Sequence, residues 1–142
     1  MKYIKHLVAA LLVMAVVPFP AFAGDTPISK KAQLYIGWPN DGEVVRSRKF
    51  RVWFGLRNAG IAPAGEVKPN AGHHHLLIDV PMPPDDEPIP ADENHVHFGS
   101  GQSETIIELA PGKHTLQLLL GDHDHIPHKR VLASKRITIT VK

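Results

Sequence analysis

The sequence contains no cysteine, and this absence excludes several classes of fold and of metal site. Disulfide-stabilised scaffolds, iron–sulfur clusters, blue-copper centres and thiolate zinc knots all require the thiol. An exported domain of this chain must therefore be stabilised by its hydrophobic core alone. Any bound metal ion would need histidine, carboxylate or the thioether of Met82 as ligands.

The chain also lacks an excess of charge of either sign once its N-terminal leader is removed. The sequence has 16 basic and 14 acidic residues, and removal of Lys2 and Lys5 with the N-terminal leader leaves 14 of each. There is no clustered basic stripe of the kind that binds phosphate backbones, so nucleic acid is excluded as an expected partner.

Long apolar runs are absent except at the N-terminus, where the pattern is typical of a secretory signal peptide. Two lysines precede the apolar residues 7–17, and the motif Ala-Phe-Ala at 21–23 supplies the small residues of a cleavage site. The run is short for a membrane span, although an uncleaved anchor is the alternative. We expect residues 1–23 to be removed, which leaves 24–142 as a single exported, periplasmic domain with no membrane contact.

Alternation of apolar and polar residues predicts strands rather than helices in the rest of the chain. Residues 34–38, 50–57, 74–80 and 137–141 each place apolar side chains at every second position, and two more strands flank the turn at 110–113. The proline-rich stretch 81–94 predicts a long surface loop with a solvated acidic tip. About seven strands indicate an all-β fold, an antiparallel immunoglobulin-like β-sandwich.

Nine of the ten histidines lie between residues 73 and 128, and they include three local clusters that each contain a His-x-His pair. On a strand, residues i and i+2 project from the same face, so both imidazoles of a pair can reach one metal ion. The predicted metal ligands are His73, His75, His95 and His97 as the principal set, with His123, His125 or His128 completing it. The predicted hydrogen-bond acceptors that would orient their rings are Asp79, Asp122 and Asp124.

Two histidines are predicted to be structural. His74 shares the apolar face of its strand with Leu76 and Ile78, which favours a hydrogen-bonded core residue. His114 follows a tight turn, where its ring can hydrogen-bond a backbone carbonyl. Solvated side chains are the alternative for the histidines at 123–128.

Nitrogen and oxygen donors without thiolate favour Cu(II) or Zn(II) over Cu(I), so copper or zinc is the expected cofactor and no organic cofactor is expected. There is no glycine-rich phosphate loop, nucleophile elbow or helical zinc-protease motif, and no catalytic residue is assigned. Three functions remain open: a metal-binding module for sequestration, delivery or sensing; a structural or interaction domain with a His/Asp hydrogen-bond network; and a metal-dependent enzyme. The recurring same-face pairs favour the first, with a metal ion as partner and another exported protein as a second class of partner.

The strings "GHHHLLID", "NHVHFGSGQ" and "PGKHTLQLLLGDHDHIPH" resemble the bacterial domain-of-unknown-function family 4399 over about residues 59–141. This resemblance implies a small exported domain and no particular activity. The string "HVHFG" is also similar to the His-x-His strand of copper–zinc superoxide dismutases. The zinc loop and disulfide of those enzymes are not recognisable here, so that likeness stays at the level of the fold.

Overall fold

The computed structural model describes residues 26–142, so the predicted signal peptide at 1–23 lies outside the described residues. The described residues form nine strands and no helix. The strands are β1 (Gln33–Trp38), β2 (Val44–Val45), β3 (Lys49–Arg57), β4 (Gly60–Ile61), β5 (Ala71–Ile78), β6 (His95–Phe98), β7 (Glu104–Glu108), β8 (Gly112–Gly121) and β9 (Ile137–Val141). In this part of the chain there is no helix with the length and hydropathy needed to cross a membrane.

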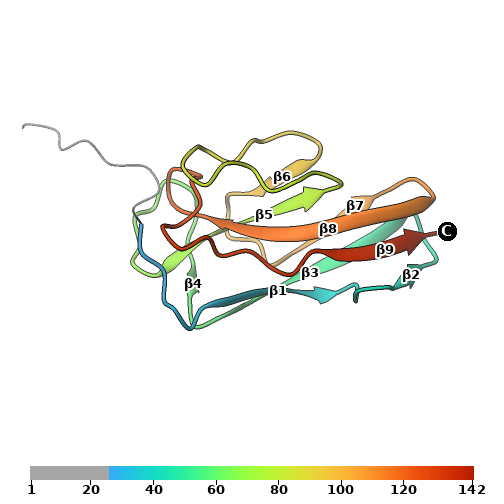
Figure 1. Cartoon of the computed structure of the whole chain (residues 1–142), viewed down its shortest axis with the longest axis horizontal. Coiled ribbons are helices and arrows are strands. Elements are labelled where there is room, and N and C mark those ends of the chain that lie inside the picture. Colours follow the sequence, from blue (N-terminus) through green and yellow to red (C-terminus); the bar gives the residue numbers. More distant parts are fainter. Residues whose placement is uncertain (1–25) are drawn as a thin grey trace, which may run out of the picture.

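The strands form two stacked sheets, which confirms the predicted all-β sandwich (Figure 1). The smaller sheet has the order β1-β3-β7, and the larger has the order β2-β9-β8-β5-β4 with β6 also paired to β5. The pairings between the longer strands are antiparallel, as predicted, and two short pairings that the sequence did not predict, β2 with β9 and β4 with β5, are parallel. β2 and β4 have two residues each, too few for alternation to reveal them in the sequence.

The main core lies between the two sheets. Phe50, Val52 and Phe54 of β3 alternate with exposed residues and pack toward the larger sheet, whose own inward residues include Leu76 and Leu118. Val52, Leu76 and Leu118 have no exposed surface, and burial of such side chains is the main stabilising term in a domain without disulfides.

Strand β5 is buried on both faces along its whole length, and this determines where the histidines lie. Its inward residues face the main core, whereas Leu77 on the outward face packs with Leu119 and Ile89 in a second apolar cluster. Ile89 is the buried residue of the loop 81–94, which contains no strand, as predicted. The loops that follow β5 and β8 therefore cover the outer face of the larger sheet.

Candidate metal centre

Four histidine rings meet on this covered outer face, and we call His73, His75, His97 and His125 the four-histidine cluster. His73 and His75 are two residues apart on β5, and the strand register places His97 of β6 directly opposite His75. His125 comes from the loop that follows β8. The six distances between ring centroids lie between 4.7 and 6.1 Å.

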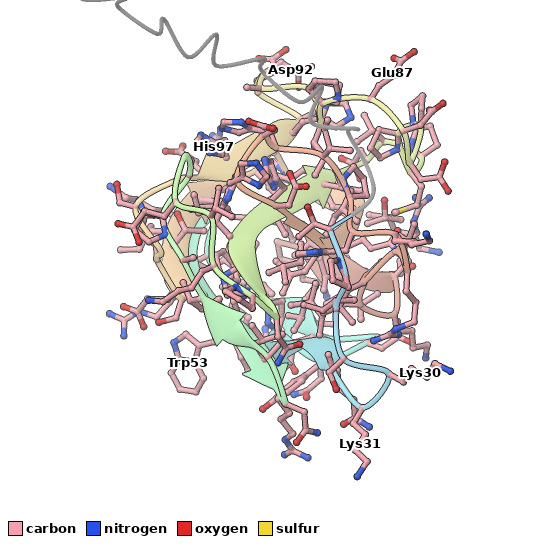
Figure 2. All side chains as sticks on the ribbon, turned by 90° about the vertical axis from the view of Figure 1, so that its left-hand side faces the viewer. Lys30, Lys31, Trp53, Glu87, Asp92 and His97 are labelled. Atoms are coloured by element: carbon pink, nitrogen blue, oxygen red, sulfur yellow. The ribbon has the colours of Figure 1, made fainter. Side chains whose placement is uncertain are left out.

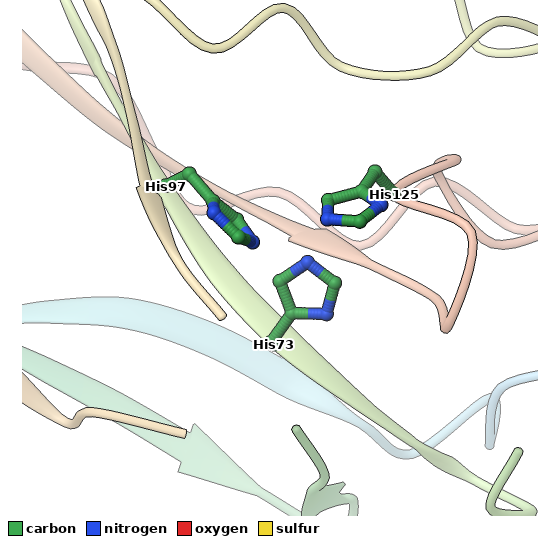
Figure 3. Close-up of side chains that lie close together, drawn as sticks. All are labelled: His73, His97 and His125. Carbon is green, nitrogen blue, oxygen red and sulfur yellow. The ribbon is translucent and has the colours of Figure 1, made fainter. Parts of the chain in front are cut away.

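Three of these rings already point at a common centre. One ring nitrogen from each of His73, His97 and His125 lies within 4.8 Å of the others. Figure 3 shows the three rings facing a common space. Nitrogen ligands at 2.0–2.1 Å from a tetrahedral ion are about 3.4 Å apart, so modest side-chain rotations would bring these three atoms to binding distance. These three side chains could hold a metal ion without rearrangement of the strands.

Five of the eight ring nitrogens of the cluster lack a hydrogen-bond partner among the described residues. Among the described residues, both ring nitrogens of His73 and of His75, and Nε2 of His97, are buried without a hydrogen bond. A buried polar group left without a partner costs about 1–3 kcal/mol. Five such atoms in one place indicate a site shaped for something other than internal hydrogen bonding.

Burial also keeps these imidazoles uncharged. Burial, together with a smaller contribution from the neighbouring cluster histidines, lowers the pKa of His73 to about 4 and that of His75 to about 2. The pKa of His97 is lowered as well, first by burial and then by His125. At neutral pH these three rings are therefore in the neutral form that binds metal ions. In the view of Figure 2, His97 lies toward the upper edge of the molecule, and Lys30 and Lys31 lie at the lower edge.

His125 is the cluster member carried by a turn instead of a strand. Its φ of 68° is left-handed, and the turn is held by the buried carboxylate of Asp122, whose Oδ1 accepts hydrogen bonds from the backbone N–H groups of Asp124 and Ile126 at 2.9 and 3.1 Å. The other oxygen, Oδ2, accepts a hydrogen bond from the Thr26 hydroxyl at 2.6 Å. Asp122 thus orients His125 through the backbone. The sequence predicted that it would orient a ligand ring directly, and the only such approach among the described residues is that of Oδ2 to Nδ1 of His123 at 4.0 Å.

Two glycines leave the space that the rings occupy. A Cβ at Gly99 would collide with the ring of His97, and a Cβ at Gly121 would lie 2.8 Å from Cε1 of His75. Neither glycine has a left-handed backbone, so the need for glycine here is one of space.

We expect Gly99→Ala to weaken metal binding by about tenfold or more, because ligand positions must hold to within about 0.5 Å. Gly60→Ala is the matched control, since a Cβ there would make an ordinary 3.4 Å contact with Ala71. Calorimetric titration with Zn(II) would measure both affinities, and equal affinities would show that the ring of His97 does not need its observed position.

Comparison with known protein families assigns the chain to one of them. The model of the domain of unknown function DUF4399 matches residues 52–142, a span that contains the whole four-histidine cluster. The chain belongs to this family. The match begins somewhat earlier than the predicted boundary at residue 59, within β3. No curated protein and no solved structure matches the chain.

Three further histidines that the sequence predicted as ligands lie outside the cluster of this DUF4399 domain. His95 shares the outer face with His97, but its Nδ1 is held by the carboxylate of Asp92 at 2.9 Å. His123 pairs with Asp124 at 3.1 Å. His128 is fully buried, with Nδ1 3.2 Å from the Thr26 carbonyl.

The position of His128 follows from strand alternation. Its Nε2 lies where a side chain of Gly72 would project, which is the face of β5 opposite His73. The structure therefore brings together His73, His75, His97 and His125 and separates His95, His123 and His128 from them. Nearby carboxylates and the face of the sheet determine which histidines join the cluster, and the His-x-His spacing reveals neither of them.

The remaining predicted residues form their own hydrogen-bonded pairs. His74 is a core residue whose Nδ1 lies 2.9 Å from the Gln102 carbonyl. His114 donates through Nε2 to the Ala110 carbonyl at 2.8 Å and through Nδ1 to Asp79 at 2.6 Å. Burial lowers the pKa of His114, but its hydrogen bonds to Asp79 and Ala110 outweigh this and raise it. Asp79 and Asp124 thus orient His114 and His123 and not the cluster.

Proposed function

We propose that this DUF4399 protein is a periplasmic metal-binding module that holds one Cu(II) or Zn(II) ion at the four-histidine cluster for sequestration, delivery or sensing. The observation that carries the proposal is the convergence of one ring nitrogen each from His73, His97 and His125 within 4.8 Å. Neutral imidazole nitrogen suits both ions, and the chain offers no thiolate to favour Cu(I).

The pattern of hydrogen bonds favours this function over a purely structural histidine network. Such a network does describe three other sites, where His95, His114 and His123 each pair with a carboxylate. In the cluster, both buried nitrogens of His73 and of His75 and one of His97 have no protein partner, whereas His74 and His128 each leave only Nε2 unpaired and place Nδ1 against a backbone carbonyl. A structural network would satisfy the cluster nitrogens, because an unpaired buried donor or acceptor destabilises the fold.

The test is calorimetric titration of the metal-free protein with Zn(II) and Cu(II). We expect one ion per chain, competition by free imidazole, and no binding by the variant His73→Ala/His97→Ala/His125→Ala. The variant His95→Ala/His123→Ala is the control, since it removes two histidines outside the cluster and should keep the stoichiometry. Binding by the first variant and not by the control would place the site elsewhere.

Export is the second part of the proposal and rests on the leader at 1–23. We expect the full-length chain, expressed in a bacterium with a periplasm, to be recovered from the periplasmic fraction with Gly24 as its first residue. Mass spectrometry of the intact protein measures this directly. Recovery of the unprocessed chain in the membrane fraction would instead indicate an uncleaved anchor.

A further inference from the structure

We infer that His75 supplies a fourth nitrogen and that the centre is a closed four-imidazole cage, with no coordination position left for water. This inference rests on the proposed metal binding and goes beyond it, because it assigns the complete coordination sphere. A complete coordination sphere also distinguishes a module that holds and releases a metal ion from an enzyme that activates a metal-bound water.

The spacing of the four rings carries the inference. In a tetrahedral centre with nitrogens at 2.0–2.1 Å, each ring centroid lies about 3.2 Å from the ion, so centroids are about 5.2 Å apart. Five of the six distances within the cluster are 4.7 to 5.1 Å, and the sixth, between His75 and His125, is 6.1 Å. The four rings already stand near the corners of a tetrahedron of the required size.

The surroundings of His75 allow its ring to turn toward the centre. No nitrogen of His75 belongs to the set within 4.8 Å, so binding requires this rotation. Both of its nitrogens are buried and make no hydrogen bond of ordinary geometry among the described residues, so the rotation gives up at most a weak contact with the His73 backbone. Gly121 leaves the space below the ring, since a Cβ there would lie 2.8 Å from Cε1.

A fourth protein nitrogen determines what the centre can do. Catalytic zinc sites keep three protein ligands and one position for water, whose pKa the ion lowers, whereas sites with four protein ligands have no such position. With His75 bound, the buried cage holds its ion away from water. Its chemistry is then storage and transfer of an ion, and hydrolysis is not supported.

Optical spectroscopy of the Co(II)-loaded protein tests the cage. We expect the intense visible bands of tetrahedral cobalt and no change on addition of azide, an anion that binds open positions. His75→Ala should lower the Co(II) affinity by more than about 100-fold, since loss of an outer-shell partner alone costs about 10–100-fold. The cobalt that still binds this variant at high concentration should respond to azide. His74→Ala is the matched control, because it removes the adjacent ring on the opposite face and should leave the bands unchanged.

The outcomes separate the two proposals. A wild-type cobalt spectrum that shifts with azide, or a His75→Ala variant with parental bands and affinity, overturns the cage while metal binding stands. Failure of the wild-type protein to bind Co(II), Zn(II) and Cu(II) overturns metal binding itself. The azide titration of the wild-type protein needs no variant, so a poorly folding His75→Ala would not leave the cage untested.

Discussion

Saturating Zn(II) is expected to raise the free energy of unfolding by about 4 kcal/mol when free zinc reaches about a thousand times its dissociation constant. The folded chain brings His73, His97 and His125 together from β5, β6 and the loop after β8, whereas the unfolded chain has only its short histidine runs. At about 3–4 °C per kcal/mol for a domain of this size, the midpoint of thermal unfolding should rise by more than about 10 °C.

The variant His73→Leu makes this prediction specific. It should remove most of the zinc-induced shift and at the same time make the metal-free protein more stable, by about 1 kcal/mol or more. The reason is that leucine replaces a fully buried imidazole whose two nitrogens have no protein partner. His95→Ala is the control and should keep the zinc shift, because the ring of His95 is held by Asp92. A metal-free His73→Leu protein less stable than the parent would show that this imidazole has a stabilising partner.

Acid is expected to destabilise the metal-free protein by several kcal/mol between pH 6.5 and pH 4. His73 and His75 have pKa values lowered from 6.5 to about 4 and about 2, mainly by burial. In this window the unfolded chain binds protons that the folded chain does not, so stability falls as the pH falls. At about 1.4 kcal/mol for each pKa unit, His73 alone accounts for about 3 kcal/mol at pH 4.

Urea unfolding at several pH values measures this slope. The metal-free variant His73→Leu/His75→Leu should show a much flatter profile than the parent over the same window. His114→Ala should act in a different window: it should lower the stability below pH 6.5, and its difference from the parent should shrink as the pH rises above 6.5 through the raised folded pKa of His114. A parent protein with equal stability at pH 6.5 and pH 4.5 would contradict the burial of neutral imidazoles.

Much of the fold follows from local sequence pattern. Alternation in 50–57 predicted β3 because one face of that strand meets the core and the other meets solvent. Burial of β5 on both faces was less evident, since histidines hold the outward positions at 73 and 75. The pairs β2–β9 and β4–β5 could not be predicted, because each short strand depends on contacts distant in sequence.

The candidate site could be predicted from the sequence where a His-x-His pair lies on a strand. His73 and His75 share a face because they are two residues apart on a strand. His123 and His125 have the same spacing on a turn, where the rule fails: the left-handed backbone at His125 sends the two rings to different surroundings. Asp92, three residues before His95, is a local signal that could have separated His95 from His97. The need for glycine at positions 99 and 121 could not be predicted, because it depends on the histidine ring that packs against each in the folded chain.

The most direct test of the metal centre is anomalous diffraction from crystals of the protein loaded with Zn(II) or Cu(II), measured at the absorption edge of the ion. We predict one peak inside the four-histidine cluster, at about 2.0–2.1 Å from ring nitrogens of His73, His97 and His125. A peak at His123 and Asp124, or no ordered ion in loaded crystals, would contradict the proposed centre.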